Sequence, residues 1–69
     1  MSKLPLANME RLLKEAGAER VSEDAKEALA EVLEIYGLDL AKDAVLLSEH
    51  AKRKTVRKED VKLAAKRMK

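Results

Sequence analysis

The densest group of reactive side chains in this sequence is the stretch HAKRKTVRKED, residues 50–60. Six basic residues surround one Thr and one Val, and two acidic residues end the stretch. Arg presents a planar fork that grips phosphate oxygens, Lys supplies a point charge, and a Thr hydroxyl can donate to a phosphate oxygen. The stretch is therefore either a loop that binds a polyanion or a solvated run of charge, which a triplet such as KRK more often is.

The distribution of charge along the chain favours the first interpretation. The 69 residues carry a formal net charge of only +2. Residues 1–50, however, hold 6 Lys/Arg and 11 Asp/Glu, whereas residues 51–69 hold 9 Lys/Arg and 2 Asp/Glu. Such a division between segments of one chain indicates a surface for a polyanionic partner.

Other classes of function lack their residues. His50 is the only histidine, and the sequence places no nucleophile or orienting partner with it. We therefore expect that the protein is not an enzyme. The chain has no Cys, no metal-binding cluster and no Gly-rich phosphate loop, which predicts neither metal nor cofactor. No apolar run reaches the roughly 20 residues that span a bilayer. The start lacks the apolar segment of a signal peptide. We therefore expect an intracellular, cytoplasmic protein without a membrane partner.

Three helices are expected to position the basic stretch. The first begins at Asn8, a good N-cap, follows Pro5 and ends at Gly17. The second begins at Ser22, and its apolar residues recur every three or four positions, which predicts one helix of about 28–30 residues. The third follows the basic stretch, with two acidic residues in its first turn and an apolar face of Val61, Ala64, Ala65 and Met68.

A chain of 69 residues forms one small domain, and two short helices cannot cover a helix about 40 Å long. The long apolar stripe therefore predicts a homodimer in which two long helices cross near Gly37, since Gly allows a close approach. The alternative is that Gly37 breaks the long helix and gives a four-helix monomer.

Two segments, LPLANMERLLKEAGAERVSEDAKEAL at residues 4–29 and HAKRKTVRKEDVKLA at residues 50–64, resemble an archaeal histone. The likeness covers essentially the whole chain, residues 1–69. It implies an all-α histone fold of a short, a long and a short helix in an intertwined head-to-tail homodimer. It also implies a chromosome-associated protein that binds, wraps and compacts double-stranded DNA without sequence specificity.

The resemblance places the first loop of one chain beside the second loop of the other, so that residues 20–21 pair with residues 55–56. Arg11 matches an arginine that is inserted into the minor groove, while Lys14 also fits a purely solvated face. The DNA-binding residues that the resemblance implies are Arg11, Lys14, Arg20, Arg53, Lys54, Thr55 and Arg57.

The resemblance also implies contacts between dimers. The matching residues at that contact are Leu47, Glu49, His50 and Asp60, with a hydrogen bond between His50 and Asp60. A salt bridge between Arg53 and Asp60 would fix the second loop. Gly17 matches a residue that lets neighbouring turns of a superhelix stack, although a simple helix end explains it equally well.

The chain departs from the family pattern at several positions. Glu49 stands where a basic residue is common, Lys52 where Gly is common, and Leu38 where a basic residue is frequent. Residues 22–49 carry 2 Lys/Arg against 8 Asp/Glu. We expect tetramers or longer polymers to be limited, and heterodimers with paralogues are possible. The alternative function is a histone-fold subunit for protein–protein interaction, with weak or no DNA binding.

Overall fold

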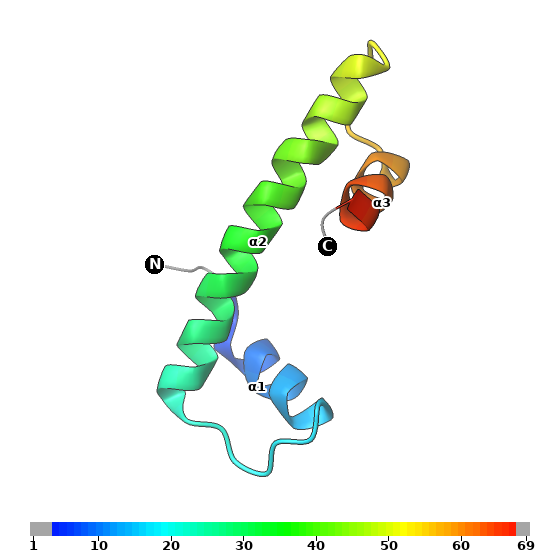
Figure 1. Ribbon diagram of the computed structural model, residues 1–69. Coiled ribbons are helices and arrows are strands. Elements are labelled where there is room, and N and C mark those ends of the chain that lie inside the picture. Colours follow the sequence, from blue (N-terminus) through cyan, green and yellow to red (C-terminus); the bar gives the residue numbers. More distant parts are fainter. Residues whose placement is uncertain (1–3, 68–69) are drawn as a thin grey trace. The chain divides into compact units, whose positions relative to one another are not determined.

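The computed structural model describes residues 4–67, and all the regular secondary structure in that range is helical (Figure 1). The helices are α1 (Leu6–Glu15), α2 (Glu23–His50) and α3 (Lys58–Arg67). The predicted all-α class and the order of a short, a long and a short helix are confirmed.

The N-cap of the first helix lies three residues earlier than the sequence suggested. Pro5 rather than Asn8 occupies the N-cap position, with φ −65 and ψ 128. Its ring fixes φ near this value, and its carbonyl accepts the first helical hydrogen bond from the Met9 N–H at 3.3 Å. Asn8 therefore lies inside the first turn, and the expected cap at Asn8 is wrong.

Gly17 ends α1 as the pattern predicted. It has φ 116, and its N–H donates to the Lys14 carbonyl at 3.0 Å. The Ala18 N–H reaches back to the Leu13 carbonyl at 3.0 Å. These two bonds form a Schellman turn, in which glycine supplies the positive φ that other residues rarely adopt.

The long helix α2 runs unbroken for 28 residues. Ser22 caps it as predicted, because its Oγ accepts a hydrogen bond from the Ala25 N–H at 3.1 Å. Glu23 and Asp24 occupy the first turn, where the helix dipole favours negative charge. The helix continues through Gly37, so the alternative of two separate helices is wrong.

The last helix, α3, carries Glu59 and Asp60 in its first turn, as expected. Of its predicted apolar face, Ala64 is buried, whereas Val61 and Ala65 are exposed. Met68 lies outside the described residues. None of the helices within residues 4–67 is both long and apolar enough to cross a membrane.

The chain divides into two compact units, residues 1–35 and residues 36–69. Met9 and Ala30 form the buried apolar core of the first unit, and Ala44 and Ala64 that of the second. These cores consist of small side chains and one Met. Larger apolar residues remain exposed: Leu6, Leu12, Val32, Ile35, Tyr36, Leu38, Val45, Leu46, Val56, Val61 and Leu63.

Candidate nucleic-acid interface

The second loop begins with a tight turn at the end of α2. The Lys52 N–H donates to the Glu49 carbonyl at 2.8 Å, and the Arg53 N–H to the Ser48 carbonyl at 2.9 Å. This is the same Schellman geometry that ends α1. Here, however, a lysine holds the left-handed position, with φ 61. The turn reverses the chain and starts the basic loop in a defined direction.

An ion pair fixes the rest of the loop. Arg53 binds Asp60 through both arms of its guanidinium, with Nη2 to Oδ1 at 2.7 Å and Nη1 to Oδ2 at 3.0 Å. The same Nη1 donates to the carbonyl of Thr55 at 2.9 Å. Asp60 Oδ2 also accepts the backbone N–H of Arg57 at 2.8 Å. The two-armed pairing and the backbone bonds hold residues 53–57 against the start of α3.

Asp60 is the electrostatic centre of this arrangement. It is 5% exposed and accepts all three of these donor groups. The hydrogen bonds from the Arg53 guanidinium, and then the one from the Arg57 N–H, lower the pKa of Asp60 to about 2. Asp60 is the third residue of α3 and satisfies the N–H of the residue before the helix, as in one half of a capping box.

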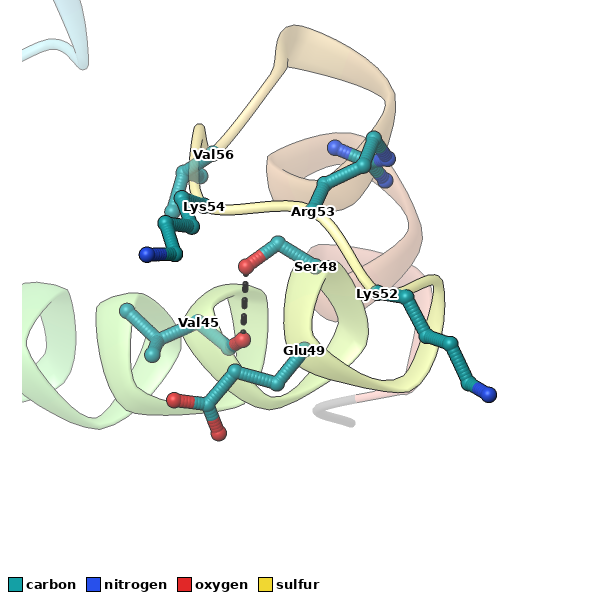
Figure 2. A pocket seen from close by; sticks show the side chains of 7 residues that line it. All are labelled: Val45, Ser48, Glu49, Lys52, Arg53, Lys54 and Val56. Atoms are coloured by element: carbon teal, nitrogen blue, oxygen red, sulfur yellow. Dashed lines mark hydrogen bonds between the residues drawn. The ribbon is translucent and has the colours of Figure 1, made fainter.

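The basic side chains that follow Arg53 point into solvent. Lys54, Thr55 and Arg57 are exposed, and no ion pair involving Lys54 or Arg57 is found among residues 4–67. Figure 2 shows Lys54 and Val56 on the same side of the loop as the Ser48 hydroxyl, while Lys52 points away from them. These side chains line a hollow of about 550 Å³. The arrangement presents cations on a backbone that is already ordered.

The first unit holds the other predicted DNA-binding residues. Arg20 is exposed in the loop between α1 and α2, and the described ion pairs do not include it. Arg11 pairs with Glu15 at 2.9 Å, and both side chains are more than half exposed. Lys14 pairs with Glu10 at 3.3 Å. Exposed pairs of this kind contribute little to stability, so both cations can exchange a carboxylate for a phosphate.

Glu10 also ties α1 to α2. Lys26 Nζ lies 3.2 Å from Glu10 and 2.7 Å from Glu23. The hydrogen bond from Lys26, followed by that from Lys14, lowers the pKa of Glu10. Glu23 and then Glu10 raise the pKa of Lys26. The network fixes the helix from which Arg11 projects.

The residues expected at the contact between dimers lie at the end of α2 and the start of α3. Glu49 and His50 are exposed, Leu47 is half-buried, and Asp60 is buried. Within one chain Asp60 is already occupied by Arg53 and Arg57. The bond between His50 and Asp60 stays a prediction. No group of three His, Cys, Asp or Glu within residues 4–67 is placed to hold a metal.

Sequence reasoning missed two residues at this site. The sequence analysis does not predict the left-handed backbone of Lys52, although the Gly that is common at this position in the family is a signal for it. Ser48 was also missed: it is 2% exposed, and its hydroxyl donates to the Val45 carbonyl at 2.8 Å (Figure 2). A serine in an apolar stripe is the only signal for it in the sequence.

Comparison with known proteins gives consistent matches. Residues 2–65 match the family described as histone-like transcription factor (CBF/NF-Y) and archaeal histone. The chain is 56% identical over 66 residues to the A subunit of the archaeal histone HAN1 from Thermococcus zilligii, covering 96% of this chain and 98% of that protein. It is 55% identical over 64 residues to probable archaeal histone 3 of Methanocaldococcus jannaschii, covering 93% and 96%.

Proposed function

The chain belongs to the family of histone-like transcription factors and archaeal histones, which are chromatin proteins rather than enzymes, and from this we propose that it binds and compacts double-stranded DNA as a histone-fold dimer. Binding is largely independent of base sequence. The observation that carries the proposal is the exposed basic loop at residues 54–57, held in place by the pair between Arg53 and Asp60.

The surface of the single chain supports a dimer. Large apolar side chains on all three helices remain exposed in the single chain, among them Leu12, Leu46 and Leu63. Exposed apolar surface of this kind marks a contact with a partner. Tyr36 and Val32 are 45% and 61% exposed near the middle of α2. A Cβ at Gly37 would meet no atom within 4 Å of its own chain, so its own packing does not require glycine there.

In the proposed dimer, cations from two chains become neighbours. The first loop with Arg20 pairs with residues 55–56 of the other chain, so that Arg20, Lys54 and Thr55 share one patch at each end. The side chain of Arg53 holds the loop and supplies part of the positive field. Arg57 lies at the edge of the patch. Such a patch neutralises phosphates without reading bases.

The start of α1 provides a second kind of phosphate site. Pro5 offers no side-chain cap, and the first turn of α1 contains no acidic residue. In contrast, α2 and α3 each carry two acidic residues in their first turns. The free N–H groups and the dipole of α1 therefore favour an anion. Arg11 and Lys14 lie on the same helix, and Arg11 enters the minor groove where the DNA bends.

Dimers join further through Leu47, Glu49, His50 and Asp60. Across such a two-fold contact Glu49 of one dimer faces Glu49 of the other, and the repulsion between the two carboxylates limits the length of polymers. Paralogues with the same fold can replace one chain of the dimer. The acidic composition of α2 favours a second candidate function, a histone-fold interaction subunit with weak or no DNA binding.

A gel mobility shift with Lys54→Ala on two unrelated DNA sequences tests the proposal. We expect the affinity to fall by the same factor on both sequences. We also expect the slope of log affinity against log salt to decrease by about 2 for two lost contacts per dimer. Lys62→Ala, an exposed change of the same charge on α3, is the matched control and has a smaller effect. A wild-type protein that shifts no DNA at moderate salt supports the interaction subunit instead.

A further inference from the structure

The second unit carries a hollow that the proposed DNA-binding residues do not use. It measures about 420 Å³ and is lined by five residues of α2: Leu38, Ala41, Lys42, Val45 and Leu46. Leu38 is 57% exposed and Leu46 53% exposed. Exposed aliphatic side chains grouped on one helix face mark an interaction surface.

The Lys42 side of the hollow lies on the opposite side of α2 from the core of its unit. Ala44 is 1% exposed and faces that core. Lys42 precedes it by two residues, which corresponds to about 200° around the helix. Gly37, where the long helices of the proposed dimer cross, is five residues from Lys42 and about 140° away around the helix. The crossing of the proposed dimer therefore reaches the Ala41 edge of the hollow, about 40° from Gly37, and leaves its Lys42 side open.

The residues around the hollow are arranged symmetrically along the helix. Leu38 lies four residues before Lys42, and Leu46 lies four residues after it. If a second α2 runs antiparallel over this face with the two-fold axis at Lys42, each Leu38 meets Leu46 of the other copy. Asp39 lies one turn before Lys42. The Lys42 side chain of each copy can therefore extend along the other helix toward Asp39 of that copy. The two Lys42 charges then point away from one another.

We propose that this face binds the same face of a second copy, so that two histone-fold dimers join back to back through Leu38, Lys42 and Leu46. The inference rests on the proposed function only in taking the dimer as the unit that pairs. It is distinct from the contact at His50. Nucleic acid does not fit this face, because Asp39 and Glu49 flank it. The face offers five lining residues, far fewer than the roughly 20–30 a side of a standard interface, so the four-chain species forms only in concentrated protein.

A disulfide trap tests the geometry directly, because the chain contains no cysteine. Lys42→Cys places a thiol on the proposed axis, where two Cα atoms approach within the roughly 7 Å that a disulfide requires. We expect mild oxidation to give a two-chain band on a non-reducing gel and a four-chain mass under native conditions. Glu31→Cys, exposed on the same side of α2, is the control. In the antiparallel pair, residue 31 of one copy would lie about 33 Å along the helices from residue 31 of the other, so the Glu31→Cys variant stays uncrosslinked.

Sedimentation equilibrium without DNA gives a second reading. We expect Leu46→Glu to weaken the association of dimers at least tenfold, while the dimer and its DNA affinity are unchanged. Leu46→Met is the matched control and keeps the association. Wild-type protein that remains dimeric at all concentrations overturns the inference, as does a Lys42→Cys variant that crosslinks no more than the Glu31→Cys variant. Failure of the dimer itself is recognised separately, as a 7.7 kDa mass in dilute protein.

Discussion

Lys52 adopts a left-handed backbone at the end of α2, with φ 61, and replacing it with glycine is expected to stabilise the protein. A residue with a side chain costs roughly 1–2 kcal/mol in this region, which glycine adopts freely. Glycine also loses about 0.5–1 kcal/mol more backbone entropy on folding. The net gain is about 0.5–1 kcal/mol per chain. The bonds from Lys52 and Arg53 to the last turn of α2 are made by backbone atoms, so they survive the substitution.

The gain is counted twice if the protein unfolds as a dimer, which gives about 1–2 kcal/mol. Two chains of 69 residues have an unfolding entropy of about 0.3 kcal/mol per degree. Lys52→Gly should therefore raise the Tm by about 3–7 °C, measured by circular dichroism at 222 nm and one fixed protein concentration.

Lys52→Ala separates the backbone effect from the side chain. Both variants remove the same charge and should therefore change DNA binding equally, but only glycine relieves the strained backbone. The difference in Tm between the two variants therefore measures the cost of the left-handed conformation. If Lys52→Gly unfolds at the same temperature as Lys52→Ala, or below it, the reasoning about this turn is wrong.

Other parts of the same geometry can be tested as directly. Asp60 has a pKa of about 2 when folded and near 3.8 when unfolded. Its contribution to stability is therefore complete above about pH 4 and is lost as the pH falls toward 2. Denaturation midpoints at pH 5, 3 and 2 should show this loss, and the Asp60→Asn variant should lose less stability between those pH values. Gly17→Ala should destabilise each chain by about 1 kcal/mol in urea unfolding, because a Cβ there meets no atom and only the positive φ opposes it, and an unchanged midpoint would contradict this. Arg11→Ala should slow the ligase-mediated circularisation of short DNA more than it weakens binding, and unchanged circularisation would exclude insertion into the minor groove.

The sequence predicted those elements whose signals agree with one another. Ser22, the acidic first turn and the apolar spacing all indicate the start and course of α2, and the helix begins at Glu23. At α1 two signals competed, because Asn8 resembles a cap while Pro5 has a fixed φ that suits the residue before a helix. The structure has Pro5 at the N-cap, and α1 begins at Leu6.

The misses at the site come from geometry that the residue type does not reveal. Lysine is not a residue that predicts a positive φ, yet the turn after α2 requires one at position 52. The three backbone and side-chain donors that converge on Asp60 depend on the fold of the whole loop. Ser48 is buried because its hydroxyl finds the Val45 carbonyl inside its own helix, which removes the need for an outside partner.

The acidic residues of α2 favour the interaction subunit over DNA binding only if their electric field reaches the basic loop. Charges in water are screened over about 8 Å at physiological salt. Asp39 lies 11 residues before the end of α2, which is about 16 Å along the helix and two screening lengths from the loop. A phosphate beside Lys54 therefore lies beyond the reach of Asp39, whereas Glu49 lines the same hollow as Lys54 and acts on it directly. At low salt the electric field of Asp39 and its acidic neighbours should extend further. Lowering the salt should therefore raise the affinity for DNA by less than the cations alone would.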